Sequence, residues 1–350
     1  MSFVELLIFL AALVALVMVH EWGHFWAARR AGMVVQEFAF GFPPRLWSKV
    51  VRGTRYAVNL LPLGGYVKIL GEDATTNKSP GAFGSKGLGW RAVVLSAGVL
   101  MNLVFAALLF SIGYATVGLP EEVVGDQGQV QVFGVAPESP AAGAGLRLGD
   151  TISKINGQSM MSIEAVQEYL KARRGETVTM SILRGESLFD VKLLVRTDPP
   201  AGQGSTGVAL GYTNLVHYDA LTAIVKGITL TLGLIWLIIS GVWQMLAGLL
   251  GGVVPTDVAG PVGIATLTAQ MHQLGLPYLL RFVGLLSVNL AVINILPLPA
   301  LDGGRLAFLL LEKIRRRAVA ARVEQWVHAL GFALLILLIL VITFNDLKRF

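Results

Sequence analysis

The residues best suited to chemistry are His20, Glu21 and His24, which form an H-E-x-x-H sequence inside an apolar stretch. On a helix, four steps of about 100° bring the two histidines back to one face, roughly one turn apart. Two imidazoles so placed can share one zinc ion, and Glu21 can take a proton from a water molecule at the metal. The pattern predicts a zinc site with Glu21 as its general base. The alternative is three unrelated polar residues on an ordinary helix.

The surroundings of this sequence favour the metal site. Between Phe3 and Val19 the only charged residue is Glu5, so the stretch is typical of a membrane helix. Ionisable side chains are costly to expose to lipid, so these three should face protein or water and find partners there.

The composition points to a membrane protein with several spans. The chain has 350 residues, of which 54% are hydrophobic and 14% charged, and its mean hydropathy is +0.67. It has no cysteine, so a metal would be held by histidine and carboxylate, and disulfides are excluded.

The charge distribution predicts the topology and argues against a nucleic-acid partner, although the net charge is +6. Residues 27–91 hold ten Lys or Arg and three acidic residues, and residues 302–325 hold six and three. Residues 119–219 hold eight basic and twelve acidic residues. Because positive loops stay in the cytoplasm, the first two segments are predicted inside and the third outside. The H-E-x-x-H sequence then lies near the cytoplasmic face.

We predict a polytopic α-helical membrane protein with about four transmembrane helices. The predicted spans are Ser2–Trp26, Ala92–Gly118, Phe282–Leu301 and Trp326–Phe344. The stretch Gly227–Thr256 is also uncharged and long enough to cross. A single crossing there would move Arg315–Arg317 outside, so we predict a helix that lies in or on the membrane without crossing it.

Short β-prone runs between the first two helices predict membrane-associated β-hairpins. They include Thr54–Leu61 and the stretch Pro62–Leu70, which contains Gly64, Gly65 and Tyr66. Non-helical backbone near lipid must be covered by protein or line a cavity. We expect Gly64, Gly65 and Tyr66 to lie beside the active site, where an unpaired edge could bind an extended substrate. The alternative is an ordinary cytoplasmic β-loop.

Asn102 lies one turn after Gly98 in the second predicted helix and needs a polar partner. Helix packing alone would explain this pair of residues. A contact with the active site is the other interpretation.

Residues 120–199 predict an inserted α/β domain. Strands are expected at 130–137, 151–157, 178–185 and 189–195, with helices at 138–146 and 162–174. The run from Ser139-Pro-Ala-Ala to Ile155-Asn-Gly closely resembles a PDZ domain. That resemblance implies a groove that takes a peptide as an added strand.

Catalytic zinc sites usually have three protein ligands, so a third ligand is needed. The remaining histidines, His217, His272 and His328, lie in positions that favour ordinary roles. Asp302 is the better candidate because it follows a predicted crossing at its cytoplasmic end, at the depth of the H-E-x-x-H sequence. Its alternative role is a turn or cap residue. Pro297 and Pro299 just before it should break the helix and free backbone groups beside a cavity.

His20-Glu-Trp-Gly-His24 and Asn294-Ile-Leu-Pro-Leu-Pro-Ala-Leu-Asp302-Gly together resemble the signature pair of the site-2 protease family of intramembrane zinc metalloproteases. Pro62-Leu-Gly-Gly-Tyr-Val-Lys68 and Gly260-Pro-Val-Gly-Ile264 are similar to its bacterial branch with a periplasmic PDZ domain. The sequence Gly98-Val-Leu-Met-Asn102 departs from the usual Gly-Pro-Leu-Ala-Asn but keeps its glycine and asparagine.

The resemblance implies zinc bound by His20, His24 and Asp302, with Glu21 as catalytic acid and base. It implies that Asn294, Pro297 and Pro299 help to hold the substrate, and that the hairpin around Gly64 and Gly65 is the family's membrane-reentrant β element.

The resulting hypothesis is an intramembrane protease of the bacterial inner membrane. It would cleave transmembrane segments of single-pass proteins, such as pre-trimmed anti-sigma factors or signal-peptide remnants. Its expected partners are such substrates, the lipid bilayer and a peptide at the PDZ groove, with no nucleic acid. The alternatives are a non-proteolytic PDZ receptor with a structural zinc site and a metal transporter. The transporter would need ionisable residues on several helices, and the second predicted helix has none.

The predicted division has four parts. Residues 1–119 form the first half of the protease core, 120–199 the periplasmic PDZ domain, 200–275 a linker with an apolar membrane-associated helix, and 276–350 the second half of the core.

Overall fold

The structure is a computed structural model that describes residues 1–72, 79–122, 129–185, 187–200, 203–251, 259–317 and 319–349. The chain divides into two compact units. The first unit comprises residues 1–109, 227–266 and 283–350, and the second unit comprises residues 110–226 and 267–282.

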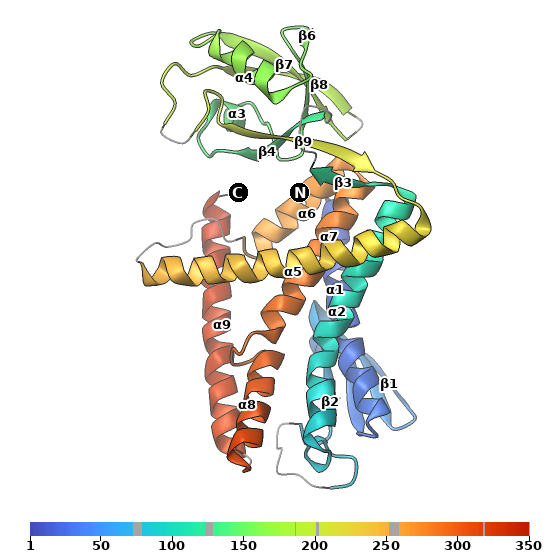
Figure 1. The fold of residues 1–350 in the computed structure, drawn as a ribbon. Coiled ribbons are helices and arrows are strands. Elements are labelled where there is room, and N and C mark those ends of the chain that lie inside the picture. The colour runs from blue at the N-terminus through green and yellow to red at the C-terminus, as the bar shows by residue number, and fades with distance from the viewer. Residues whose placement is uncertain are drawn as a thin grey trace. The chain divides into compact units, whose positions relative to one another are not determined.

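Helices make up most of the first unit, and the second unit is built around a sheet (Figure 1). The α-helices are α1 (Phe3–Arg30), α2 (Leu88–Thr116), α3 (Pro140–Gly143), α4 (Ile163–Lys171), α5 (Ala220–Leu250), α6 (Pro261–Leu274), α7 (Leu276–Ile295), α8 (Asp302–Arg315) and α9 (Ala321–Arg349). The strands are β1 (Val35–Val51), β2 (Thr54–Ile69), β3 (Leu119–Glu122), β4 (Gln129–Val135), β5 (Thr151–Ile155), β6 (Gln158–Ser159), β7 (Thr177–Arg184), β8 (Ser187–Leu194) and β9 (Val208–Val216).

Five helices in the described part of the chain are long and apolar enough to cross a membrane, namely α1, α2, α5, α7 and α9. The prediction of a polytopic helical membrane protein with additional strands is therefore confirmed. The count of about four crossings stays a prediction, because α5 meets the same criteria as the other four. The last residues of the predicted Gly227–Thr256 segment, from 252 on, lie outside the described residues.

Helix α1 begins with a capping box, which gives Glu5, the only charged residue between Phe3 and Val19, a hydrogen-bond partner. The Ser2 hydroxyl accepts the Glu5 N–H at 3.2 Å, and the Ser2 N–H donates to the Glu5 carboxylate at 2.6 Å. The helix continues to Arg30, past the predicted end near Trp26, and carries the motif histidines in its second half.

The helix before Asp302 breaks at the prolines, as predicted. Helix α7 ends at Ile295, and α8 begins at Asp302 after a short loop that contains Pro297 and Pro299. Proline lacks the N–H that a helix interior needs and disfavours helical backbone at the residue before it, so two prolines in three residues end the helix.

Helix α9 continues to Arg349, past the end predicted for the last crossing at Phe344. Asp346 in this extension is buried, and its carboxylate accepts the N–H groups of Gly260 and Gly263 at 3.2 and 2.7 Å. A carboxylate at a helix N-terminus satisfies donors that have no partner within the helix. The contact joins the beginning of α6 to the end of α9.

The contacts within the first unit fix the directions of its helices. Gly23 of α1 packs so closely on Ala97 of α2 that an added Cβ would overlap the Ala97 carbonyl. Along α1 from His20 to His24, the neighbouring residues on α2 run backwards from Asn102 to Val94, so these helices are antiparallel.

Helices α7 and α8 also run opposite to α2. The Ser287 hydroxyl donates to the Asn102 carbonyl at 2.8 Å, and further along the chain Glu312 binds Arg91. Since α1 and α7 both run opposite to α2, they point in the same direction.

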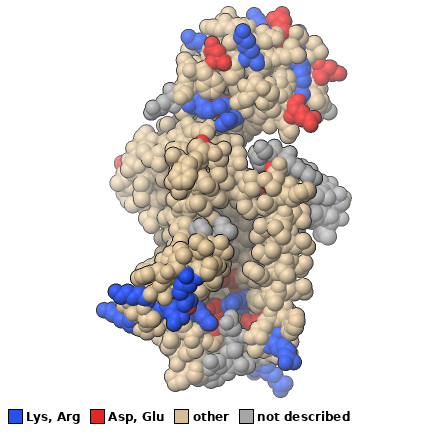
Figure 2. All heavy atoms as spheres, turned by 180° about the vertical axis from the view of Figure 1, so that it is seen from behind, with Lys and Arg blue, Asp and Glu red and all other residues tan. Residues whose placement is uncertain are grey.

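Strands β1 and β2 confirm the predicted β structure between α1 and α2. They form an antiparallel pair in which residues 37–40 face residues 65–68 on one side and residues 55–58 on the other. The described residues 65–68 pair on one side only, so they form an edge. Arg45, Lys49, Arg52 and Arg55 of this hairpin are exposed. In Figure 2, Lys and Arg side chains gather toward one end of the first unit.

The sheet of the second unit has the strand order β3-β9-β4-β5-β7-β8, with β6 paired to β5. Its core includes the fully buried side chains of Val132, Ile152 and Met180. The four predicted strands are all present as β4, β5, β7 and β8, and the helix predicted at 162–174 is α4.

Strand β9 was not predicted. It lies between β3 and β4 although it follows residue 199, where the predicted domain ends, so the sheet continues to residue 216. The Pro-Pro-Ala-Gly run before β9 favours a linker. The position of β9 in the sheet depends on its pairing with β3 and β4, which are distant in sequence.

The ion pair between Arg91 and Glu312 fastens α8 to α2. Both Arg91 Nη atoms lie 3.0 Å from the Glu312 carboxylate, and Arg91 is only 3% exposed. We expect Glu312→Gln to lower the free energy of unfolding by about 3 kcal/mol, because it leaves a buried guanidinium without its counter-charge.

Thermal unfolding of the purified protein in detergent checks this expectation, with the double variant Arg91→Met/Glu312→Leu as the comparison. The double variant should melt above the single one, since it buries no unpaired charge. Equal melting temperatures for the single variant and the wild type would contradict the expectation.

Candidate metal centre

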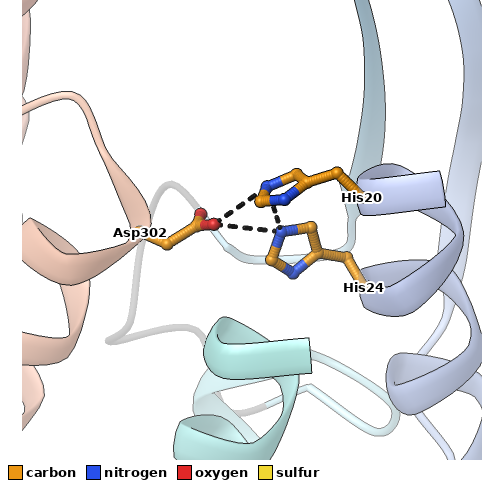
Figure 3. Close-up of side chains that lie close together, drawn as sticks. All are labelled: His20, His24 and Asp302. Carbon is orange, nitrogen blue, oxygen red and sulfur yellow. Dashed lines mark hydrogen bonds and ion pairs between the residues drawn. The ribbon is translucent and has the colours of Figure 1, made fainter. Parts of the chain in front are cut away.

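Three potential metal ligands from the two ends of the chain meet in the first unit (Figure 3). His20 and His24 come from successive turns of α1, and Asp302 is the first residue of α8. Oδ2 of Asp302 lies 3.0 Å from Nε2 of His20 and 3.2 Å from Nε2 of His24, and the two nitrogens are 3.1 Å apart. The structure thus brings together the ligand set predicted from the sequence.

These distances fit a shared zinc ion. Zinc binds histidine nitrogen and carboxylate oxygen at about 2.0–2.2 Å, so two ligands of one tetrahedral ion lie about 3.3 Å apart. The histidines are 7% and 9% exposed, and Asp302 Oδ2 is buried with no hydrogen-bond donor among the described residues. A buried carboxylate oxygen that faces two imidazole nitrogens is suited to a cation, and three protein ligands leave one position open for catalysis.

Helix α2 holds the imidazole of His24. Its Nδ1–H donates to the Val94 carbonyl at 2.8 Å, which leaves the Nε2 lone pair directed toward the other ligands. The sequence offered no signal for Val94, because the group that acts is its backbone carbonyl.

Gly98 provides the space for both rings. A Cβ at this position would overlap His24 Nε2 and lie 2.7–2.8 Å from the His20 ring. The sequence indicated a small residue suited to helix packing, and the resemblance to the site-2 protease family included this glycine. In the structure, Gly98 lets the ligands lie against the backbone of α2.

Asn102 is fully buried, and its Nδ2 lies 3.5 Å from Nδ1 of His20, while its Oδ1 has no partner among the described residues. A half-turn of the amide would place Oδ1 on the His20 Nδ1–H and satisfy both groups. Of the two interpretations from the sequence, the structure supports the contact with the candidate site, since Asn102 lies beside the candidate ligand His20.

Glu21 lies between the metal ligands in sequence and faces the β hairpin. A Cβ on Gly65 would lie 3.5 Å from Glu21 Cγ and 3.4 Å from Met18 Sδ, so the edge of β2 passes directly beside Glu21. Tyr66, the next residue, donates its hydroxyl hydrogen to Glu37 at 3.0 Å, and its ring stacks on Phe42. Of the three residues predicted to lie beside the active site, Gly65 is therefore the one that the structure places next to Glu21.

The glycines after Asp302 allow α8 to begin close to the end of α7. A Cβ on Gly303 would overlap the carbonyls of Ile295 and Leu296, and one on Gly304 would overlap the Leu298 carbonyl. This packing holds Asp302 beside the loop that contains Pro297 and Pro299. Asn294 lies in the last turn of α7, half-buried, whereas Pro297 is exposed.

The comparisons with known proteins agree with this site. Residues 8–338 match the model of peptidase family M50. A putative zinc metalloprotease of Nostoc sp. is 34% identical over 93% of this chain and 91% of its own length. The zinc metalloprotease RasP of Oceanobacillus iheyensis is 31% identical over 95% and 96%. The regulator of sigma-E protease RseP of Escherichia coli is 30% identical over 99% and 98%.

Among solved structures, the PDZ domain of an SdrC-like protein from Listeria monocytogenes aligns with 26% of this chain and 93% of its own. The identity is 25% and the TM-score 0.22.

The match to the family model covers nearly the whole chain, including both ends that supply the ligands. The relatives from Nostoc sp. and Oceanobacillus iheyensis are named as zinc metalloproteases, the first as a putative one, and each matches over more than 90% of both chains. This chain therefore belongs to peptidase family M50, the site-2 protease family, and is a zinc metalloprotease of regulated intramembrane proteolysis.

Proposed function

We propose that this protein cleaves peptide bonds within transmembrane segments of single-pass membrane proteins. The observation that carries the proposal is the meeting of His20, His24 and Asp302, with Glu21 beside a β edge. The histidines lie on α1, which is long and apolar enough to cross a membrane, so the reaction would take place within the bilayer.

The proposed chemistry uses Glu21 as the proton carrier. Bound zinc supplies Lewis acidity that polarises the scissile carbonyl and acidifies a water molecule. Glu21 takes a proton from the attacking water and passes it to the nitrogen of the leaving amine. His20, His24 and Asp302 hold the metal, and we propose that Asn102 acts on the reaction through its contact with His20.

The proposed substrate site combines the β2 edge with the loop after α7. A transmembrane helix hides its peptide bonds in internal hydrogen bonds, so it must unwind before cleavage. Residues 64–66 offer unpaired backbone groups to an extended strand, and Asn294, Pro297 and Pro299 would hold the strand from the other side.

We propose four crossings, with the active site near the cytoplasmic face and the inserted domain outside. Helices α1 and α7 point in the same direction, and α2 points in the opposite direction. The chain between the end of α2 and the beginning of α7 must therefore start and finish on the same side of the membrane. Within the first unit, α5 lies across the direction of α2 and α9, which supports a helix that lies in or on the membrane (Figure 1).

We propose that residues 119–216 form a periplasmic PDZ domain. Its groove between β6 and α4 is lined by Met160, Tyr169 and Arg173 among others and would take a peptide. Standing outside, the domain would exclude substrates whose ectodomain is intact. Recognition of a newly formed C-terminus is the alternative role.

The proposed natural substrates are pre-trimmed anti-sigma factors or signal-peptide remnants. The name of the Escherichia coli relative, a regulator of sigma-E protease, supports the first class. The proposed location is the bacterial inner membrane.

The test is cleavage of membrane-anchored reporters by the full-length protein in lipid nanodiscs. One reporter carries a folded ectodomain, a second is trimmed to a short tail, and a third has the short tail with an amidated C-terminus. Mass spectrometry of the products locates the cut, which we expect within the transmembrane segment. A cut only in the soluble tails would overturn the proposal.

The three reporters also separate the two roles of the PDZ domain. Exclusion by size predicts that both short reporters are cleaved and the folded one is not. Recognition of a C-terminus predicts that amidation abolishes cleavage. Equal cleavage of all three would contradict both roles.

A further inference from the structure

The loop between α7 and α8 contains a strained residue two positions before the metal ligand Asp302. Ala300 has a φ of +74°, in the left-handed region that residues with a Cβ rarely adopt. Such a conformation persists only where the surroundings hold it in place. The position of Asp302 therefore depends on whatever fixes this loop.

Helix α9 makes two direct contacts with the loop. The Ala300 N–H donates to Nδ1 of His328 at 2.9 Å. One turn further along α9, Gly331 lies so close to Pro299 that an added Cβ would overlap the proline ring. Residues three apart share one face of a helix, so a single face of α9 contacts the consecutive residues Pro299 and Ala300.

His328 is itself held in place. Its ring lies 5.5 Å from the ring of Phe308 on α8, the helix that begins at Asp302. The imidazole thus contacts the loop on one side and α8 on the other. It accepts a hydrogen bond at Nδ1, so the ring is neutral with its proton on Nε2.

We propose that His328 is a positioning residue for the metal centre. It accepts the Ala300 N–H, holds the left-handed backbone, and thereby places Asp302 opposite His20 and His24. The inference rests on Asp302 being a metal ligand, as proposed above. His328 touches neither metal nor substrate, and its role is exerted through the loop.

Two substitutions of His328 separate this role from simple packing. Asn carries an oxygen close to the position of Nδ1 and can still accept the Ala300 N–H, whereas Leu fills similar space without an acceptor. Gly331→Ala pushes on Pro299 from the same face of α9 and leaves His328 intact. Val323→Ala, at an exposed position of α9, is the control.

The measurement is the zinc dissociation constant of the full-length protein, by competition with a chromophoric chelator in detergent. We expect about ten-fold weaker binding for His328→Leu, a smaller loss for Gly331→Ala, and near wild-type affinity for His328→Asn and Val323→Ala. Thermal unfolding of the zinc-free forms identifies any variant that fails to fold.

Wild-type zinc affinity in folded His328→Leu would overturn the proposal. So would an equal loss of affinity in His328→Asn and His328→Leu. If His328→Leu does not fold, the comparison of His328→Asn with Gly331→Ala decides, and unchanged affinity in Gly331→Ala overturns the proposal. The zinc measurement uses no substrate, so its result does not depend on whether the proposed intramembrane cleavage takes place. Absence of zinc binding by the wild type would instead refute the metal centre itself.

Discussion

Glu21→Gln is expected to lower kcat/KM for the trimmed reporter by about 10²–10⁴-fold while the protein keeps its zinc. Glutamine has nearly the shape of glutamate but cannot accept a proton at neutral pH. Glu21 is not among the three converging ligands, and it faces the β2 edge where we propose that the substrate lies. The change removes proton transfer and leaves the metal ligands in place.

Cleavage rate and zinc content of the same purified sample check this expectation. Glu5→Gln is the matched control, since Glu5 lies on the same helix and caps its first turn, away from the candidate ligands. Normal turnover of Glu21→Gln would refute the role of Glu21. Loss of zinc together with activity would indicate that Glu21 supports the metal rather than the proton transfer.

Gly98→Ala is expected to abolish cleavage by displacing the metal ligands, although it adds only one methyl group to a helix. The new Cβ would overlap the His24 ring and press on the His20 ring, so both imidazoles must turn away from Asp302. Alanine favours helix more than glycine does, so α2 itself should not be weakened. We expect zinc affinity to fall by about 100-fold, at the upper end of what disturbed ligand support costs.

The same substitution at Gly89 is the control. Gly89 lies in the first turn of α2, and a Cβ there meets no atom within 4 Å. Gly89→Ala should keep wild-type zinc affinity and activity. If Gly98→Ala also binds zinc normally, the close approach of the two imidazoles to α2 is not a feature of the working site.

The sequence predicted the ligands because their spacing is local. His20 and His24 share a helix face wherever that helix lies, and Asp302 follows a predicted crossing at the matching depth. The charge distribution predicted that both motifs lie near the cytoplasmic face, since positive loops stay on that side of the membrane. The resemblance to the site-2 protease family joined the two motifs, and the structure places them in contact.

The supporting residues could not be predicted in the same way. Val94 acts through its carbonyl, Gly98 through its missing side chain, and His328 through a contact with Ala300 in a loop 28 residues away. The roles of Val94 and His328 leave no mark on residue type or spacing, and for Gly98 the sequence indicated the glycine but not the two rings that it contacts. Strand β9 was missed for a related reason, because its place depends on pairing with β3 and β4.

By itself, the sequence determined that this is a membrane protein with a two-part zinc motif, because hydropathy, charge and helical spacing are properties of short segments. Only the tertiary structure decided that the β2 edge passes beside Glu21. It also decided that α2 contacts His20 and His24, and that α9 contacts the loop before Asp302. Those features depend on which distant segments pack together, and packing is set by the shapes of all the partners at once.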